Sequence, residues 1–190
     1  MSSSARVRRR RVHRAQLLCN MGRVMFERPA MIRTATPADT PAVVALVVDT
    51  AMFLPHEVGP VHEMLANFHA GRLGAGHLVE VWTDDPDRPP SGVAYFGPDA
   101  MTDRKWDLWM IAVAPDRQGH GIGGALLRSA EGHVLAGGGR LLLIETSSLP
   151  RFDAARAFYG KHAYTEVARI PDFYADGDSK VVFARRILAP

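Results

Sequence analysis

Two periodicities divide the chain from residue 31 onward. Short apolar runs bounded by glycine, proline or acidic residues predict strands, and apolar residues spaced three or four apart predict helices. The predicted strands cover residues 32–35, 77–83, 92–96, 106–113, 140–146, 164–170 and 180–187. The predicted helices cover residues 37–49, 58–70, 122–136 and 153–162, and a loop at 171–179 joins the last two strands. The order β-α-α-β-β-β-α-β-α-β-β predicts an α/β domain whose mixed sheet has helices on both faces.

The segment at residues 118–124, Gln-Gly-His-Gly-Ile-Gly-Gly, joins the apolar run at 108–113 to the helix that follows. Glycines at four of its seven positions remove the side chains that would keep a ligand away from the backbone. The first N–H groups of a helix have no partner within the helix, and the helix dipole favours an anion there. The sequence therefore predicts a phosphate-binding site in this segment, which we call the glycine loop.

Four interpretations of the glycine loop compete. A Walker loop is excluded, because no Lys-Ser or Lys-Thr pair follows the glycines. The dinucleotide pattern G-x-G-x-x-G fits residues 119–124, with Glu145 as the acid in the next apolar run. The pattern Q-x-x-G-x-G fits residues 118–123, preceded by Val-Ala-Pro at 113–115. A glycine-rich turn that binds no ligand is the fourth interpretation.

With the Q-x-x-G-x-G pattern the chain resembles the GCN5-related N-acetyltransferases (the GNAT family), in which this turn holds the pyrophosphate of acetyl-coenzyme A (acetyl-CoA). The predicted order of elements from Met31 to about Leu188 is similar to the acetyltransferase fold. The antiparallel strands predicted within residues 77–113 do not suit a dinucleotide-binding domain, which repeats strand and helix. The resemblance implies a mixed, mostly antiparallel central sheet with helices on both faces.

A second stretch extends the resemblance. Residues 155–164, Ala-Arg-Ala-Phe-Tyr-Gly-Lys-His-Ala-Tyr, resemble the family pattern A-x-x-F-Y-E-K-x-G-F. The chain departs from this pattern at Gly160, where an acid is common, and at Ala163, where glycine is usual. Phe152 stands where the family often has asparagine. Tyr159 occupies the position at which the family commonly places the acid that protonates the departing thiol.

The resemblance implies transfer of an acetyl group from acetyl-CoA to an amine, by direct attack in a ternary complex. Acetyl-CoA is then a co-substrate, and the reaction needs no metal. The residues implied for coenzyme binding are Ile111, Ala112, Val113, Gln118, Gly119, His120, Gly121, Ile122, Gly123, Gly124 and Phe158. The alternative function is a non-catalytic acyl-CoA sensor, which keeps the glycine loop and reports its occupancy to a partner.

The predicted chemistry needs a base as well as an acid. An alkyl ammonium ion has a pKa of about 10.4 and must lose a proton before its nitrogen attacks a thioester. Asp107 lies six residues before Val113, where histone-acetyltransferase members of the family place a glutamate, and Glu145 ends the neighbouring strand. We rank Asp107 first and Glu145 second as the base, with Tyr159 as the acid. For both carboxylates the alternative is a solvated strand end, with a water chain as the base.

The predicted acceptor site comprises Phe53, Leu54, Trp109, Phe173 and Tyr174. Acidic residues at positions 172, 176 and 178 follow or flank the last two of these, and would favour a cationic amine near the acceptor mouth. The alternative for these acids is an ordinary solvated loop. We expect the acceptor to be an amine-bearing small molecule or a peptide.

Charge is distributed unevenly along the chain. The 190 residues carry a net charge of +3, but residues 1–30 hold eight arginines and one glutamate, which leaves −4 for residues 31–190. We expect residues 1–30 to be a basic, disordered extension and residues 31–190 to be the acetyltransferase domain. An organelle transit peptide, a nucleic-acid-binding arm and a membrane-surface segment are the alternatives for the extension. No aromatic residue interleaves the arginine cluster at 6–14, so we expect no nucleic-acid partner.

The remaining composition narrows the class of protein. Hydrophobic residues make up 47% of the chain and charged residues 23%, as in soluble globular domains. The single cysteine, Cys19, excludes an internal disulfide and fits a reducing compartment, so we expect a cytoplasmic protein. No uninterrupted apolar run reaches the roughly 18 residues of a membrane helix, and the histidines show no metal-ligand spacing. We expect a monomer or a homodimer, with no membrane partner and no metal.

Overall fold

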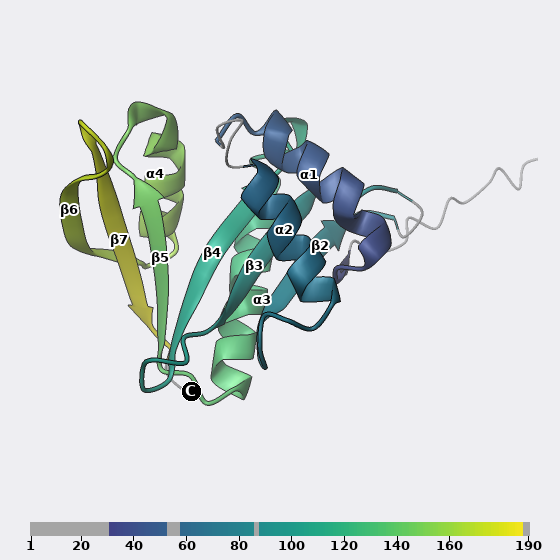
Figure 1. Ribbon diagram of the computed structural model, residues 1–190. Coiled ribbons are helices and arrows are strands. Elements are labelled where there is room, and N and C mark those ends of the chain that lie inside the picture. The colour runs from purple at the N-terminus through teal and green to yellow at the C-terminus, as the bar shows by residue number, and fades with distance from the viewer. Residues whose placement is uncertain (1–30, 53–57, 86–87, 188–190) are drawn as a thin grey trace, which may run out of the picture.

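The computed structural model describes residues 31–52, 58–85 and 88–187. The predictions made for residues 1–30, Phe53 and Leu54 lie outside these ranges. The described strands are β1 (Met31–Thr34), β2 (Leu78–Thr83), β3 (Gly92–Pro98), β4 (Lys105–Val113), β5 (Leu141–Ser147), β6 (Thr165–Ala175) and β7 (Asp178–Arg186). The described α-helices are α1 (Thr40–Asp49), α2 (Val58–His69), α3 (Ile122–Ala136) and α4 (Asp153–Lys161) (Figure 1).

The seven described strands form one sheet in the order β1-β2-β3-β4-β5-β7-β6. Every neighbouring pair is antiparallel except β4 and β5, which are parallel. The ladder between β4 and β5 joins only four residue pairs, from Lys105–Leu141 to Leu108–Ile144. Beyond that last pair both strands continue, and Figure 1 shows them diverging. The sheet is therefore divided along the C-terminal halves of β4 and β5.

Helices cover both faces of the sheet, α1 and α2 in front of β2–β4 and α3 behind them (Figure 1). Successive side chains of a strand point to opposite faces, so each strand contributes to two cores. The buried core under α1 and α2 contains Val43, Leu46, Val47, Val61, Leu65, Val79, Val81, Val93, Met110 and Ala112. The buried core under α3 and α4 contains Ala94, Phe96, Trp106, Leu108, Ile122, Leu126, Leu127, Ala130, Val134, Leu142, Ile144, Tyr159, Tyr164, Val181, Phe183 and Ile187.

A β-bulge interrupts the pairing of β3 and β4. Tyr95 is paired with Met110 and Phe96 with Leu108, so Trp109 has no residue opposite it on β3. Because a bulge bends its strand and increases the local twist, this one turns β4 at the position where the ladder with β5 has just ended. Trp109 is left 45% exposed at the point of divergence.

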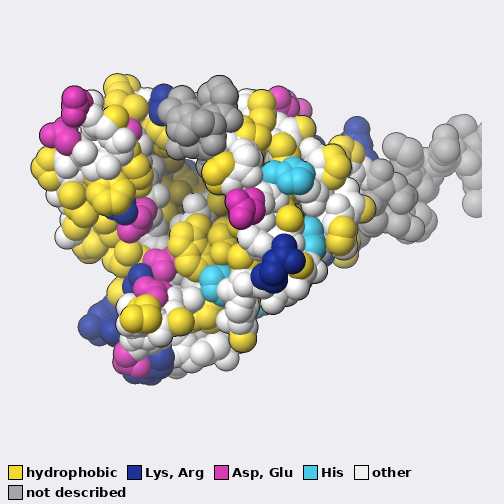
Figure 2. Space-filling model, viewed as in Figure 1, with side chains coloured by type: hydrophobic (Ala, Val, Ile, Leu, Met, Phe, Trp, Pro, Cys, Tyr) yellow, Lys and Arg dark blue, Asp and Glu magenta, His cyan; other side chains and the backbone are white. Residues whose placement is uncertain are grey.

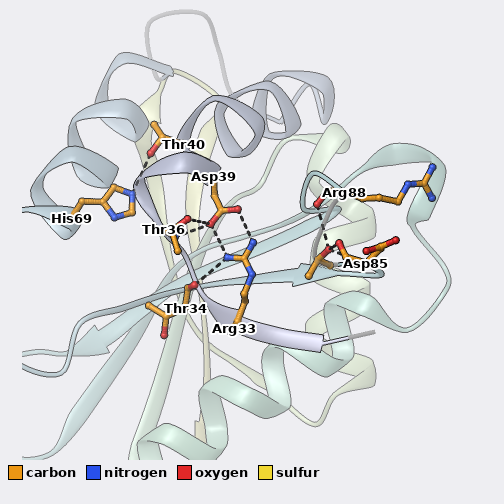
Figure 3. A network of polar contacts seen from close by, with 9 residues as sticks. Arg33, Thr34, Thr36, Asp39, Thr40, His69, Asp85 and Arg88 are labelled. Atoms are coloured by element: carbon orange, nitrogen blue, oxygen red, sulfur yellow. Dashed lines mark hydrogen bonds and ion pairs between the residues drawn. The ribbon is translucent and has the colours of Figure 1, made fainter. Parts of the chain in front are cut away.

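One carboxylate organises the turn from β1 into α1 (Figure 3). The guanidinium of Arg33 donates two hydrogen bonds to the Asp39 carboxylate, at 2.7 and 2.8 Å. The backbone N–H and the hydroxyl of Thr36 donate to the same carboxylate, both at 2.7 Å. These hydrogen bonds hold the pKa of Asp39 well below its usual range, the largest cause being the hydrogen bond from Arg33. Thr40 and His69, whose Oγ1 and Nε2 lie 3.2 Å apart, join the start of α1 to the end of α2.

The predicted order of elements and the mixed, mostly antiparallel sheet with helices on both faces are confirmed. The predicted helix start at residues 36–37 is also present, as a 3-10 turn at Pro37–Asp39 that runs into α1. The predicted loop at 171–179 is wrong, because β6 continues to Ala175 and β7 already begins at Asp178. Asp176 and Gly177 form a two-residue hairpin turn there, and Gly177 has a φ of +78°.

Candidate active site

A cavity of about 610 Å³ lies where β4 and β5 diverge. Its lining comes from the C-terminal half of β4, the glycine loop, α3, the end of β5 and α4, together with Thr50 and Met52 after α1. The lining residues that the sequence predicts are Trp109, Ile111, Ala112, Val113, Gln118, Gly119, Gly121, Ile122, Gly123, Gly124, Glu145, Phe158 and Tyr159. The structure thus brings most of the predicted coenzyme, catalytic and acceptor residues to one cavity.

Four predicted residues within the described ranges lie elsewhere. Asp107 and His120 do not line this cavity, and neither do Phe173 and Tyr174. His120 Nδ1 lies 2.9 Å from the backbone oxygen of Gln118, so this ring nitrogen donates a hydrogen bond within the glycine loop. Its ring therefore supports the shape of the loop, a role that the family pattern alone does not suggest.

The glycine loop leaves β4 through a 3-10 turn at Pro115–Arg117 and enters α3 through Gly121. The side-chain amide of Gln118 donates to the backbone oxygen of Val113 at 3.1 Å, which ties the loop back to the end of β4. The first hydrogen bond of α3 runs from the N–H of Ala125 to the oxygen of Gly121, at 3.0 Å. The three N–H groups between them have no acceptor within the helix, and a helix end with free N–H groups is suited to an anion.

The four glycines of the loop serve two different purposes. Gly119 and Gly121 have φ values of +78° and +84°, and no other atom lies within 4 Å of a β-carbon built on either. They allow the left-handed turn and leave open space above the backbone. A β-carbon on Gly124 would lie 2.9 Å from the His162 ring, and one on Gly123 would lie 3.4 Å from Phe158. These two glycines instead allow α4 to pack closely on α3.

Cations gather around the loop, and the sequence patterns did not single them out. Arg117, Arg128 and Lys161 all line the cavity. Arg117 is paired with Asp84 at 2.7 Å, whereas Arg128 and Lys161 make no ion pair with a described residue. Arg128 lies four residues after Gly124 on α3, hence on the same side of the helix, and this spacing is the signal that would have identified it. The loop end of the cavity is suited to a polyanion.

Tyr159 on α4 is 6% exposed, and its ring packs on Tyr164 and Phe183. Among the described residues none hydrogen-bonds to its hydroxyl, although the residue lines the cavity. Burial raises the pKa of this hydroxyl above its ordinary value. Tyr159 therefore keeps its proton across the neutral range, and no described residue accepts a hydrogen bond from it.

The two candidate bases are each paired with a lysine. Glu145 Oε2 lies 2.6 Å from Lys180 Nζ, and Glu145 is the one carboxylate among the described lining residues. Asp107 Oδ2 lies 3.0 Å from Lys105 Nζ, which also contacts Asp99 at 2.7 Å. Burial raises the pKa of Asp107, and the pairing with Lys105 only partly opposes this shift. Glu145 thus faces the cavity, while Asp107 belongs to a neighbouring ion-pair cluster.

Lys180 connects the predicted acceptor residues on β6 to Glu145, because it contacts both Glu145 and the ring of Phe173. Lys180 Nζ sits 3.6 Å from the centre of the Phe173 ring, and Phe173 and Tyr174 are each about half exposed. Of the predicted loop acids, Asp178 is buried, and its carboxylate accepts a hydrogen bond from the Ser147 hydroxyl at 2.5 Å. Asp178 therefore fixes the end of β5 and is not a solvated loop acid that could attract an amine.

Within the described ranges no set of three or more His, Cys, Asp or Glu side chains is arranged to hold a metal ion. No helix in the same ranges is long and apolar enough to cross a membrane.

The sequence and fold are those of a known family. The profile of the acetyltransferase (GNAT) domain matches residues 77–166. A chain from Desulfovibrio desulfuricans assigned to the GNAT acetyltransferases is 32% identical, with a TM-score of 0.75, over 84% of this chain and 99% of that chain. The protein therefore belongs to the GNAT family of acetyltransferases, as the glycine loop and the residues around Tyr159 predict.

More distant structures share the fold. The ribosomal-protein-S18-alanine N-acetyltransferase of Escherichia coli is 20% identical, with a TM-score of 0.66, over 85% of this chain and 96% of its own. A Salmonella typhimurium protein assigned to the acetyltransferases, whose structure contains its cofactor acetyl-CoA, is 17% identical, with a TM-score of 0.63, over 86% of this chain and 96% of its own. No curated protein sequence matches the chain.

Proposed function

We propose that the protein transfers the acetyl group of acetyl-CoA to a primary amine, by direct attack within a ternary complex. The observation that carries this proposal is the placement of Tyr159 and Glu145 around the division of the sheet. Tyr159 belongs to the core under α3 and α4. Glu145 follows Ile144 of that same core, so its side chain points to the opposite face, which α1 and α2 partly cover. An acid and a base thus line one cavity from opposite faces of the sheet.

The loop end of the cavity is suited to the phosphates of coenzyme A. The free N–H groups at the start of α3 and the positive φ of Gly119 and Gly121 provide a backbone surface for the pyrophosphate. Arg128 and Lys161 supply positive charge that no described carboxylate neutralises. Backbone groups of β4 beyond Leu108, no longer paired with β5, are available to the pantetheine arm.

Acetyl-CoA supplies a thioester whose carbonyl carbon accepts the amine nitrogen, so that a C–N bond forms and the C–S bond breaks. Glu145, directly or through one water, accepts the proton that the ammonium must lose. Backbone N–H groups near Val113 on β4 stabilise the negative charge that develops on the carbonyl oxygen. Tyr159 donates a hydrogen bond and then its proton to the departing sulfur. The attacking nitrogen loses a second proton to solvent as the amide forms, and solvent returns one proton to Tyr159, so that atoms and charges balance with no further reactant.

The test combines binding with turnover. Calorimetric titration measures acetyl-CoA affinity, and release of free thiol measures transfer to each amine of a broad panel. We expect tight binding and thiol release that depends on the amine. Binding without release from any amine would instead support the acyl-CoA sensor.

Two matched variants separate the candidate bases. Glu145→Gln and Asp107→Asn each remove one charge from a carboxylate paired with a lysine. We expect Glu145→Gln to lower kcat by about 100-fold or more, the usual size of general-base assistance. Because Asp107 does not line the cavity, we expect Asp107→Asn to lower kcat much less. The reverse order would return the role of base to Asp107.

A further inference from the structure

Trp109 is supported from one side by two other rings. Its ring centre lies 5.0 Å from that of His77, with the planes only 7° apart, and 4.7 Å from that of Tyr95. The centres of His77 and Tyr95 are 6.0 Å apart, and His77 Nδ1 and the Tyr95 hydroxyl lie 3.0 Å from each other. If the two rings sandwiched the indole, their centres would be about 10 Å apart, twice a typical stacking distance. Both therefore stack on the same side of Trp109.

No other ring of the described residues stacks on the opposite side of the indole. Trp109 is the bulged residue of β4, it is 45% exposed, and it lines the cavity. Tyr95 packs against the core under α1 and α2, so the three rings lie on that face of the sheet. An exposed tryptophan fixed by stacking from behind loses little side-chain entropy when a ligand packs on its front. The ring is therefore a preformed apolar surface in the cavity.

A carboxylate stands directly across the division of the sheet from this surface. Leu108 and Ile144 form the last pair of the β4–β5 ladder, so Trp109 and Glu145 are the next residues on the two diverging strands. Glu145 lies on the face covered by α1 and α2 because it follows Ile144 of the opposite core, and Trp109 lies on that face because its ring stacks on Tyr95. Figure 2 shows this face hollowed between its two halves, with hydrophobic side chains inside the hollow and acidic ones at its margin.

We propose that the acceptor is an arylalkylamine, a primary amine joined by a short alkyl chain to a flat aromatic ring. The ring stacks on the side of Trp109 opposite His77 and Tyr95, and the amine lies against Glu145. Paired strands are about 5 Å apart, and Trp109 and Glu145 directly follow the last pair of the ladder, so we expect a chain of about two or three carbon atoms to connect the ring and the amine. This inference rests on the proposed function and names the class of its acceptor.

The charges around the two residues agree with this ligand. Lys180 already shows how the region holds an ammonium group, because its Nζ contacts Glu145 at 2.6 Å and lies over the ring of Phe173 at 3.6 Å. An acceptor amine would lie on the other side of Glu145, where the carboxylate and the ring of Trp109 provide a similar combination. Burial lowers the pKa of His77, which keeps the ring behind Trp109 uncharged at neutral pH and removes a source of repulsion for a cationic amine.

The experiment compares amines that differ only in the ring. Thiol release from acetyl-CoA gives kcat/KM for 2-phenylethylamine and for 2-cyclohexylethylamine, which has the same chain and a saturated ring. Aromatic stacking is worth about 0.5–1.5 kcal/mol beyond burial, so we expect a preference of roughly two- to thirteenfold for the aromatic amine. Hexylamine, spermidine and a peptide with an alanine N-terminus complete the panel and should be poorer acceptors than 2-phenylethylamine.

Variants at the stacking residue connect the preference to the site. In Trp109→Leu we expect the ratio between the aromatic and saturated amines to fall to about one, whereas Trp109→Phe should keep part of it. Retained calorimetric affinity for acetyl-CoA shows that each variant is folded.

Equal kcat/KM for the two ring amines, an unchanged ratio in Trp109→Leu, or a better acceptor among the non-aromatic amines would each overturn the inference while leaving acetyl transfer intact. Binding of acetyl-CoA without thiol release from any amine would overturn the proposed function together with it.

Discussion

At the scale of single residues, the Tyr159 hydroxyl differs from that of its neighbour Tyr164. Both rings are buried in one core, but the Tyr164 hydroxyl donates to Glu131 at 3.0 Å, whereas none of the described residues hydrogen-bonds to the Tyr159 hydroxyl. Since buried hydroxyls normally have partners, a hydroxyl with none among the described residues, on a side chain that lines the cavity, is available to a bound ligand. The two tyrosines therefore form a matched pair for mutation.

We predict that Tyr159→Phe lowers kcat by about 10²- to 10⁴-fold, because general-acid assistance to the departing thiol is lost. The affinity for acetyl-CoA should change little, since the ring is kept and the hydroxyl acts mainly in the transition state. Steady-state and single-turnover rates measure the loss. Tyr164→Phe, the control, should keep its rate and lose about 1 kcal/mol of stability with its hydrogen bond. Wild-type single-turnover rates in Tyr159→Phe would assign that residue to packing alone.

Burial also fixes the pH range over which Tyr159 acts. Its pKa lies above the ordinary value, so the acid form persists throughout the neutral and mildly alkaline range. Any fall in the rate within this pH range must therefore come from the titration of another group.

At the scale of elements, the glycine loop and the start of α3 act as one unit. Gly121 is the residue before the first helical turn, has a φ of +84°, and has open space where a β-carbon would be. Gly132, in the same helix, also has open space but an ordinary helical backbone. A substitution at Gly121 therefore tests both conformation and ligand contact, while the same substitution at Gly132 tests neither.

We predict that Gly121→Asp strongly weakens acetyl-CoA binding. A carboxylate about 4–8 Å from a phosphate charge costs about 2–4 kcal/mol at an effective dielectric constant of 20, or roughly 30- to 1,000-fold in affinity. Isothermal titration calorimetry measures the change. Gly121→Ala should show the smaller effect of backbone strain alone, and Gly132→Asp should bind like the wild type. If Gly121→Asp binds with unaltered affinity, the pyrophosphate does not lie at this loop.

The turn from β1 into α1 is a second unit, built on Asp39. Its folded-state pKa lies below the unfolded value of about 3.9, so its contribution to stability is complete at neutral pH and is lost as the pH falls through that value toward the folded pKa. We predict that Asp39→Asn lowers the free energy of unfolding by about 1.5–3 kcal/mol at pH 7, and that this gap narrows below about pH 4. Urea denaturation at several pH values tests this.

The control for Asp39 is another ion pair. Asp103 contacts Arg104 at 3.3 Å, but its side chain is 73% exposed, so Asp103→Asn should change the stability by less than about 1 kcal/mol. Equal effects of Asp39→Asn and Asp103→Asn would mean that the buried network does not stabilise the turn.

The sequence predicted these elements well where one local signal dominated. The glycine loop, the helix start at Thr36 and Pro37, and the buried strands all follow from short-range patterns. The hairpin between β6 and β7 was missed because its turn signal, Asp176-Gly177, stands among other acids and polar residues that resemble a long loop. Irregular pairing of β6 between Ile170 and Ala175 hides the alternation that would have identified the strand.

At the scale of the whole molecule, the site depends on features that no single segment encodes. The bulge at Trp109 and the end of the β4–β5 ladder are relations between strands, so the opposed positions of Trp109 and Glu145 could not be derived from the chain order alone. The sequence ranks Asp107 before Glu145 as the candidate base from its spacing along β4. That spacing does not reveal which of the two carboxylates lines the cavity, and in the structure it is Glu145. Family resemblance supplied the fold; side-chain direction came from the structure.

The short ladder between β4 and β5 also means that few backbone hydrogen bonds connect the two halves of the sheet. One half, β1–β4, and the other, β5–β7–β6, share four residue pairs before they separate. A ligand that hydrogen-bonds to β4 and packs on β5 and α4 replaces the strand pairing that ends at Leu108 and Ile144. Part of its binding energy therefore stabilises the association of the two halves. At 100 times its dissociation constant such a ligand adds about 2.7 kcal/mol to the resistance against unfolding. If acetyl-CoA binds between β4 and β5 as proposed, it stabilises the sheet in the way that an additional strand would.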